Sequence, residues 1–348
     1  MQRRDFFKTT GLAGLAAGFS LSFDMTENDL SEKPRLIKPA RLRAGATVAL
    51  IAPAGPFTVE KMANARRNFE NLGFKIREGS NLYARNGYLA GTDEQRLSDL
   101  HWAFSDPAID AVWCIRGGYG CTRLLPKVDF ERIRKNPKPF IGYSDVTALH
   151  LAIRQKTGLV TFHGPVAASD FPDDTLRHFR STLMEPLLDY EIRIPGATEQ
   201  LTGEEFRPFP IAPGKARGTL TGGNLSLLSA MAGTPFSPSF KKKIVFIEDV
   251  GEQPYRIDRM LTQLLQATDL QEAAAIVLGV FFDCKPKPDA PSLSLEETLR
   301  DRLGGLNIPV IYGIPFGHVP NQATFPYGVE AELNVEKGTL TLLEIGVV

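Results

Sequence analysis

Apolar and amphipathic segments alternate along the first half of the chain. Two nearly continuous apolar runs are typical of strands buried on both faces of a sheet, and the segments around them carry apolar residues at helical spacing. Strands are predicted at 46–52, 73–78 and 109–115, and helices at 59–72 and from the capping box Thr92–Gln95 onward. This order predicts an α/β domain over residues 36–168, with a mainly parallel, Rossmann-like sheet and helices on both faces.

The periodicity changes sharply between residues 140 and 158. Phe140-Ile141-Gly142 indicates the end of a strand, and a helical pattern begins at Asp145. Ser144 therefore lies on a strand-to-helix turn, where free helix N–H groups can stabilise developing negative charge. Two interpretations fit this position: a nucleophile, or a serine that only caps the helix. The nucleophile pattern G-x-S-x-G is incomplete, because Val146 stands in place of its second glycine.

A Pro- and Asp-rich stretch with few periodic runs, residues 169–212, is predicted to be a connector that partly packs. Beyond it, residues 213–348 are predicted to form a second α/β domain, because apolar strands again alternate with amphipathic helices. Strands are expected at 244–250, 274–281 and 308–314, helices at 225–231, 256–268 and 294–304, and a terminal hairpin around Glu336-Lys337-Gly338.

The N-terminus has the layout of an export signal. Arg3-Arg4-Asp5-Phe6-Phe7-Lys8 resembles a twin-arginine signal and precedes a weakly hydrophobic run, although an amphipathic helix is the plainer alternative. We predict that residues 1–35 are a signal and tether, and that the protein is periplasmic, membrane-tethered if the signal is uncleaved. No other segment reaches the about 20 apolar residues of a membrane span. Forty basic residues balance forty acidic ones, so charge favours neither nucleic acid nor a membrane surface as partner.

A serine nucleophile requires a base, usually His, which a carboxylate orients. Of the five histidines, His318 and His163 both follow strands, and His318 lies in a loop made rigid by Gly and Pro. His150 is assigned to the core or a helix face, and His101 and His178 to solvated helix faces.

Glu248 is the candidate carboxylate, because it ends an apolar strand and must be solvated, paired or hydrogen-bonded there. Asp249, facing the other way, is the alternative acid. Alternatively, Glu248 has no part in catalysis and only forms a salt bridge with Arg256 or Arg259.

The loop Arg116-Gly117-Gly118-Tyr119-Gly120 follows the strand at 109–115. Its glycines permit close approach, so an oxyanion hole from the amides of Asp145 and Gly117 or Gly118 is predicted. A nucleotide-phosphate loop is the alternative, but G-x-G-x-x-G and a P-loop Lys are absent. Three cysteines, without C-x-x-C or clustered His, predict no metal site and at most one disulfide.

Several of these motifs together resemble the LD-carboxypeptidase family of serine peptidases, which includes the microcin C self-immunity peptidases. The resemblance spans residues 40–345 and rests on RGGYG (116–120), GYSD (142–145), GNL (223–225), IEDVGEQPYRIDRML (247–261) and GIPFGH (313–318). It implies a catalytic triad of Ser144, Glu248 and His318, with oxyanion donors at the amides of Gly118 and Asp145. It also implies an active site between the two domains, a homodimer and no cofactor.

The resemblance implies hydrolysis of the L,D bond between meso-diaminopimelate and terminal D-Ala in murein tetrapeptides. Arg116, with Gly117 beside it, is a candidate for holding a substrate carboxylate, since a guanidinium pairs with carboxylates through two bonds. Two alternatives remain: detoxification of a peptidyl-nucleotide antibiotic, and binding of muropeptides without turnover. The export signal departs from well-known family members, which recycle murein in the cytoplasm.

Overall fold

The computed structural model describes residues 35–195, 203–288 and 290–348, which belong to one compact unit, Pro34–Val348. The predicted export signal and tether therefore lie outside the described residues, apart from Arg35. Within the described residues no helix is long and apolar enough to cross a membrane.

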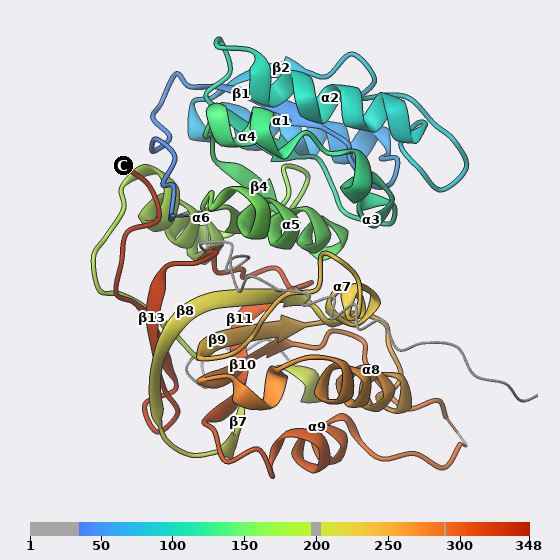
Figure 1. The fold of residues 1–348 in the computed structure, drawn as a ribbon, viewed down its shortest axis with the longest axis vertical. Coiled ribbons are helices and arrows are strands. Elements are labelled where there is room, and N and C mark those ends of the chain that lie inside the picture. Colours follow the sequence, from blue (N-terminus) through green and yellow to red (C-terminus); the bar gives the residue numbers. More distant parts are fainter. Residues whose placement is uncertain (1–34, 196–202, 289) are drawn as a thin grey trace, which may run out of the picture. The chain divides into compact units, whose positions relative to one another are not determined.

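A six-stranded sheet forms the first half, in the order β12-β5-β4-β3-β1-β2 (Figure 1). All neighbouring strands are parallel except β12, which pairs antiparallel with β5 and comes from far along the chain. The strands are β1 (Thr47–Ile51), β2 (Lys75–Glu78), β3 (Ala111–Cys114), β4 (Phe140–Gly142), β5 (Phe162–His163) and β12 (Phe325–Pro326). The predicted α/β fold with a mainly parallel sheet is confirmed.

The helices of this half begin and end at the residues that the sequence indicates. Thr58 caps one helix, Thr92 forms the expected capping box with Gln95, and Gly73 and Gly158 end helices in the left-handed conformation. The helices are α1 (Val59–Leu72), α2 (Asp93–Ser105), α3 (Cys121–Leu124), α4 (Phe130–Lys135) and α5 (Thr147–Thr157).

The second half contains an eight-stranded sheet in the order β6-β14-β13-β8-β9-β10-β11-β7. Its centre, β8 to β11, is parallel, and antiparallel strands flank it. The strands are β8 (Lys215–Asn224), β9 (Lys243–Glu248), β10 (Ala275–Val280), β11 (Val310–Gly317), β13 (Glu330–Asn334) and β14 (Thr339–Leu342), and the helices are α7 (Leu225–Met231), α8 (Pro254–Ala267) and α9 (Leu295–Leu303). The expected hairpin is β13–β14, and the glycine-rich segment before Asn224 is a strand.

The stretch predicted as a connector contains more structure than its sequence indicates. It holds α6 (Asp173–Phe179), β6 (Tyr190–Arg193) and β7 (Phe209–Ala212), and the two strands form opposite edges of the second sheet. Each strand has four residues, and β7 contains Pro210, which an edge strand tolerates. Such short strands are defined by distant partners, β14 and β11, and leave almost no periodic signal.

An aromatic layer joins the two halves. Phe246 of β9 packs against Phe316, Phe325 and Tyr327, with ring centroids 5.1–5.9 Å apart. The Tyr327 hydroxyl donates a hydrogen bond to the Gly222 carbonyl (2.9 Å), which ties this layer to β8. Figure 1 shows α5 lying between the first sheet and β8. Ser144 follows β4, Glu248 ends β9 and His318 follows β11, so the hydrogen bonds of His318 to the other two residues bring the carboxyl ends of the three strands together.

Candidate active site

Ser144 lies on the turn between β4 and α5 with a φ of 62°, a conformation that is strained for a residue with a side chain. A short 3₁₀ turn, Ser144–Val146, then leads into α5. No side chain forms a capping hydrogen bond at the start of this turn or at the start of α5. The capping interpretation is therefore wrong, and the Ser144 hydroxyl instead lies 3.1 Å from His318 Nε2.

His318 connects Ser144 to Glu248. Its Nδ1 lies 2.8 Å from Glu248 Oε2, while its Nε2 faces the serine. Since an ionised carboxylate only accepts, Nδ1 carries the proton and the Nε2 lone pair points at the Ser144 hydroxyl. This is the orientation that a histidine general base needs. The structure thus brings together three residues that are 104 and 70 positions apart in the chain.

Glu248 is fully buried at the end of β9, and among the described residues its ion-pair partner is His318 rather than an arginine. Arg256 pairs instead with Glu252, and the Arg259 guanidinium lies over the Tyr255 ring. Burial raises the pKa of Glu248, but the charge and hydrogen bond of His318 outweigh it, so the pKa is lowered and the carboxylate is ionised.

His318 shows the reciprocal effect. Burial lowers its pKa, while the charge and hydrogen bond of Glu248, with help from Asp249, raise it above the ordinary value. Asp249 points away from the imidazole and accepts hydrogen bonds from Asn224 Nδ2, from the Ser226 amide and hydroxyl, and from the Val250 amide. It therefore stabilises the start of α7 and is not the orienting acid.

Glycines of β8 allow the second half of the chain to approach the turn that carries Ser144. A Cβ at Gly223 would lie 2.5 Å from Thr147 Cγ2, so only glycine fits there. The amide of Asn224 donates to Thr147 Oγ1 (3.1 Å), three residues beyond the nucleophile, and Asn224 pairs with Glu248 across β8 and β9. This chain of contacts fixes the carboxylate relative to Ser144.

The loop at 116–120 lies against the nucleophile turn. A Cβ at Gly117 would lie 2.8 Å from Ser144 Cβ and 3.3 Å from the Asp145 nitrogen. Gly118 follows with a φ of 125°, and the Asp145 carboxylate accepts a hydrogen bond from the Cys121 amide (2.8 Å). Asp145 thus anchors the far end of the loop to the turn. The structure thus brings Gly117 against Ser144 and the Asp145 nitrogen, and Gly118 lines the same cavity as Ser144.

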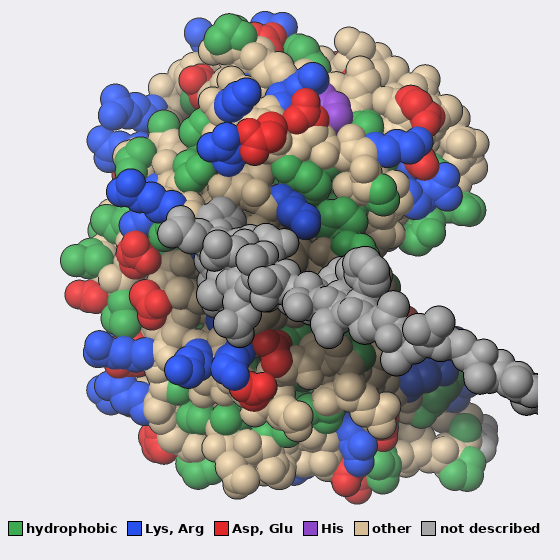
Figure 2. All heavy atoms as spheres, viewed as in Figure 1, with side chains coloured by type: hydrophobic (Ala, Val, Ile, Leu, Met, Phe, Trp, Pro, Cys, Tyr) green, Lys and Arg blue, Asp and Glu red, His purple; other side chains and the backbone are tan. Residues whose placement is uncertain are grey.

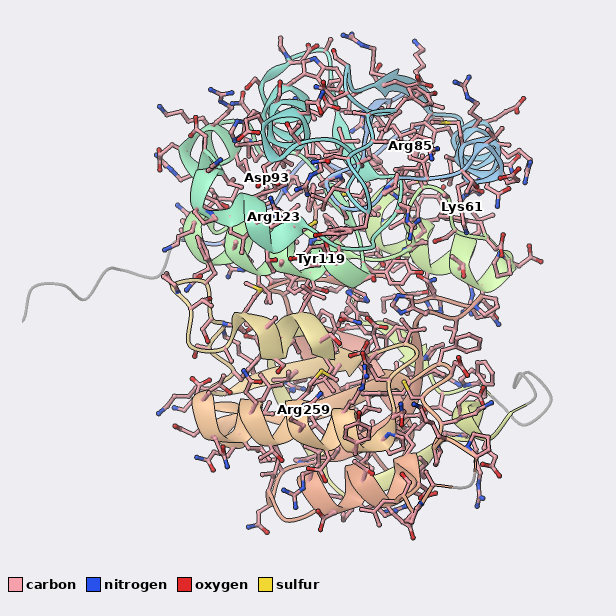
Figure 3. The ribbon with its side chains drawn as sticks, turned by 90° about the vertical axis from the view of Figure 1, so that its right-hand side faces the viewer. Lys61, Arg85, Asp93, Tyr119, Arg123 and Arg259 are labelled. Carbon is pink, nitrogen blue, oxygen red and sulfur yellow. The ribbon has the colours of Figure 1, made fainter. Side chains whose placement is uncertain are left out.

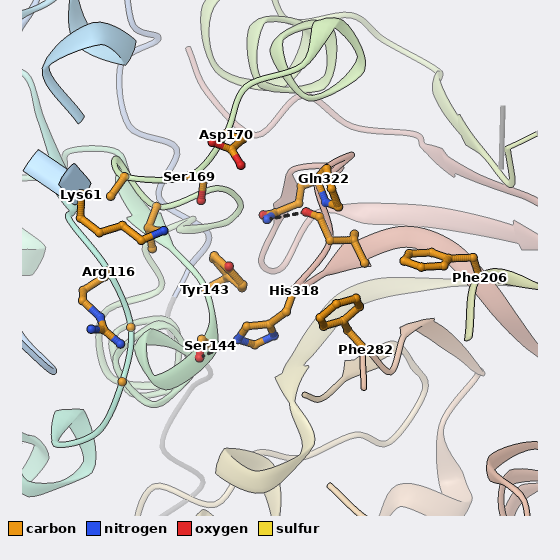
Figure 4. Close-up of a pocket in the computed structure, with 16 residues that line it drawn as sticks. Lys61, Arg116, Tyr143, Ser144, Ser169, Asp170, Phe206, Phe282, His318 and Gln322 are labelled. Atoms are coloured by element: carbon orange, nitrogen blue, oxygen red, sulfur yellow. Dashed lines mark hydrogen bonds between the residues drawn. The ribbon is translucent and has the colours of Figure 1, made fainter. Parts of the chain in front are cut away.

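These residues line a cavity of about 590 Å³ (Figure 4), a volume within the range of small-molecule sites. Ser144 and His318 lie together at one end, Lys61 and Arg116 form one wall, and Phe206 and Phe282 form the opposite wall. Arg116 Nη1 donates to the Pro56 carbonyl (2.8 Å), which holds the guanidinium at the wall. Arg116 therefore lies where a substrate carboxylate can reach it.

The remaining histidines have structural surroundings. His150 is buried and bonds through Nε2 to the Gly142 carbonyl (2.9 Å), as a core role requires. The prediction of a solvated His178 is wrong, because its ring is buried and lies 2.8 Å from the Tyr190 hydroxyl of β6. His101 is half-buried and accepts from the Asp129 amide. His163 is buried and packs against Tyr143, next to the nucleophile.

Sequence reasoning missed most of the cavity wall. Tyr143 packs edge-on against His318, with centroids 4.9 Å apart, and burial together with the charge of Glu248 raises its pKa to about 12. Its only sequence signal is its place beside Ser144. Lys61, Asp170, Phe206 and Phe282 reach the cavity from four separate segments, and nothing in their local pattern distinguishes them.

Charges of both signs are interspersed over the face shown in Figure 2. Asp93 and Arg123, which form an ion pair on the first half, lie near Tyr119 (Figure 3).

Within residues 35–195, 203–288 and 290–348, no group of three or more His, Cys, Asp or Glu side chains is arranged to hold a metal ion. Cys114, Cys121 and Cys284 are buried free thiols, so the disulfide that the sequence allowed is not formed.

Comparison with known proteins agrees with this geometry. The LD-carboxypeptidase N-terminal domain model matches residues 48–164, and the C-terminal domain model matches residues 217–333. A "Probable murein peptide carboxypeptidase" of Bacillus subtilis is 42% identical over 311 residues, which cover 89% of this chain and 95% of that protein.

Two solved structures share the fold. Muramoyltetrapeptide carboxypeptidase from Oxalobacter formigenes has a TM-score of 0.72 and 32% identity, covering 85% of this chain and 98% of its own. The microcin C7 self-immunity protein MccF, in complex with aspartyl sulfamoyl adenosine, has a TM-score of 0.78 and 26% identity, covering 90% and 100%. The chain therefore belongs to the LD-carboxypeptidase family and is a carboxypeptidase.

Proposed function

We propose that the protein hydrolyses the L,D bond between meso-diaminopimelate and the terminal D-Ala of murein tetrapeptides. The observation that carries this proposal is the relay from Ser144 through His318 to the buried Glu248, with distances of 3.1 and 2.8 Å. The names of the relative from Bacillus subtilis and of the structure from Oxalobacter formigenes support murein peptides as the substrate class.

In the proposed reaction, Ser144 Oγ attacks the carbonyl carbon of the scissile bond while His318 Nε2 takes the hydroxyl proton. The charge on the carbonyl oxygen is stabilised by the amides of Gly118 and Asp145. The close approach of Gly117 to Ser144 and to the Asp145 nitrogen supports this role. Glu248 stabilises the imidazolium formed in this step.

The tetrahedral intermediate then collapses. Its C–N bond breaks, His318 returns the proton to the departing amine of D-Ala, and the rest of the peptide remains as an ester of Ser144. Water attacks this ester with His318 again as base, which releases the tripeptide and restores the serine. Arg116, held at the wall by Pro56, is proposed to pair with a carboxylate of the substrate.

A second candidate is cleavage of a peptidyl-nucleotide. The similarity to MccF in complex with aspartyl sulfamoyl adenosine, over 90% of this chain, supports it. The same serine relay serves both reactions, so the difference must lie in the walls of the cavity.

The two candidates are separated by comparing kcat/KM of the full-length protein for disaccharide-tetrapeptide and for a peptidyl-adenosine of the same class as the MccF ligand. D-Ala release, followed by mass spectrometry, is expected to exceed nucleoside release by at least about tenfold. The opposite order would assign the protein to peptidyl-nucleotide cleavage and reject the murein proposal.

We also propose that residues 1–35 direct export by the twin-arginine route and that the mature protein is a periplasmic homodimer. The motif Arg3-Arg4-Asp5-Phe6-Phe7-Lys8 supports export. Replacing both arginines with lysine is expected to retain the protein in the cytoplasm, as fractionation would show. Sedimentation velocity tests the dimer, and a single monomeric species at micromolar concentration would reject it.

A further inference from the structure

His163 has no role in the reaction described above, yet its position is unusual. It ends β5, where it pairs with Gly142 of β4 and with Phe325 of β12. The residue is 1% exposed, and neither of its ring nitrogens has a hydrogen-bond partner among the described residues. A buried polar side chain is normally hydrogen-bonded, so this imidazole requires a partner that the fold places within reach.

The ring of His163 packs against residues next to the triad. It packs against Tyr143, Phe246 and Phe316, with centroids 6.0, 5.2 and 6.0 Å away. Tyr143 precedes Ser144, while Phe246 and Phe316 lie two residues before Glu248 and His318. Side chains two residues apart on a strand point to the same face, so Phe246 and Glu248 share one face of β9. His163 thus supports all three segments that carry the triad.

One triad atom matches what His163 lacks. Glu248 Oε2 bonds to His318, while Oε1 is buried and makes no hydrogen bond to a described residue. The neighbouring Asn224 side chain, which donates to Asp249, also lowers the pKa of Glu248. Glu248 and His163 also affect each other electrostatically: the carboxylate raises the pKa of His163, and the imidazole lowers that of Glu248. An imidazole N–H and a carboxylate oxygen are complementary donor and acceptor.

We propose that His163 is a positioning residue for Glu248, whose Oε1 accepts a hydrogen bond from the His163 ring N–H through one bridging water. The bond fixes the rotation of the carboxylate, and the carboxylate in turn fixes His318. This inference rests on the proposed serine mechanism but not on the identity of the peptide substrate.

The His163 ring donates this hydrogen bond as a neutral imidazole. Burial lowers the pKa of His163 to about 4, so the ring is uncharged at neutral pH. Loss of the hydrogen bond from His163 leaves the Glu248–His318 pair with a greater affinity for a proton, because the ionised carboxylate loses a stabilising contact. The titratable groups that face His163 are Tyr143 beyond β4, His150 of α5, Glu248 of β9 and His318 beyond β11.

The test uses the full-length protein and the second-order rate of its inactivation by a fluorophosphonate, measured against pH. This rate depends on Ser144, His318 and Glu248 but needs no peptide. His163→Leu is expected to lower the rate by about tenfold or more at pH 7. The acidic limb of the pH profile of inactivation is expected to move to higher pH by about one unit in His163→Leu. The amide variants His163→Asn and His163→Gln place an N–H near the two ring nitrogens in turn, and one of them is expected to restore both quantities.

His150→Leu is the matched control, because it removes another buried neutral imidazole that packs against the same aromatic layer through Tyr327. The inference is overturned if His163→Leu shifts the limb no further than His150→Leu, or if neither amide variant rescues. KM for the tetrapeptide is expected to stay unchanged in His163→Leu, because His163 does not line the cavity.

If His163→Leu does not fold, nitrogen-15 NMR of the His163 ring in the parent protein and in Glu248→Gln tests the bond instead. A hydrogen-bonded His163 N–H signal that shifts in Glu248→Gln supports the bond, and an unchanged signal overturns it. Inactivation without D-Ala release would reject the murein substrate and leave this inference standing.

Discussion

Glu248→Gln isolates the contribution of the buried acid. Glutamine has nearly the same shape but no charge, and its amide can present N–H to His318 Nδ1 where the carboxylate presents Oε2 at 2.8 Å. In that arrangement the ring proton moves to Nε2 and points at Ser144, so the histidine can no longer act as the base. The substitution thus removes both the correct tautomer and the charge that stabilises the imidazolium.

The magnitude follows from the geometry. At 2.8 Å and an effective dielectric constant of about 20, a carboxylate and an imidazolium attract each other by about 6 kcal/mol, before the cost of desolvation. In serine proteases with the analogous Asp, the amide variant loses about 10⁴ in kcat, which corresponds to about 5 kcal/mol. We therefore expect kcat/KM for D-Ala release to fall by about 10³–10⁴-fold.

The pH profile provides the second readout. His318 must be neutral to act, so activity rises with pH through its pKa. Glu248 is the main reason that this pKa is raised against the effect of burial, so the acidic limb of Glu248→Gln should move to lower pH. Unfolding free energy should change by no more than about 1 kcal/mol, because no uncompensated buried charge remains. A loss smaller than about tenfold, or an unmoved acidic limb, would refute the relay.

Two further predictions concern the loop and the second acid. Gly117→Ala should lower kcat/KM by at least about 10²-fold, because its Cβ would lie 2.8 Å from Ser144 Cβ, whereas Gly305→Ala, with no atom within 4 Å, should be silent in the same assay. Burial and the charge of Glu248 raise the pKa of Asp249 to about 6, so the folded protein binds this proton more tightly than the unfolded chain. Urea unfolding should therefore show that the parent loses about 2 kcal/mol relative to Asp249→Asn as pH rises from about 4 to 7, and parallel pH curves would contradict this assignment.

Local patterns were sufficient for much of the fold. Strands buried on both faces appear as apolar runs, and caps such as Thr92 and Gly158 mark helix boundaries chemically, so β1, β3, α1 and α5 were predictable. The strand-to-helix turn at Ser144 follows from the same signals.

What local patterns cannot supply is contact between distant segments. The edge strands β6 and β7 exist because β14 and β11 offer them partners, and β12 joins the first sheet from near the C-terminus. The cavity wall has the same origin, since Phe206 and Phe282 become neighbours only through the second sheet. His163 illustrates the limit most clearly: its sequence context shows a strand end, but only the packing places it against residues next to the triad.

The most direct test of the serine relay is D-Ala release from disaccharide-tetrapeptide by the full-length protein and by Ser144→Ala, followed by mass spectrometry. We predict release by the parent and a loss of at least about 10³-fold in the variant, whose fold should be unchanged by circular dichroism. Equal release by both proteins would contradict the assignment of Ser144 as the nucleophile and, with it, the mechanism proposed here.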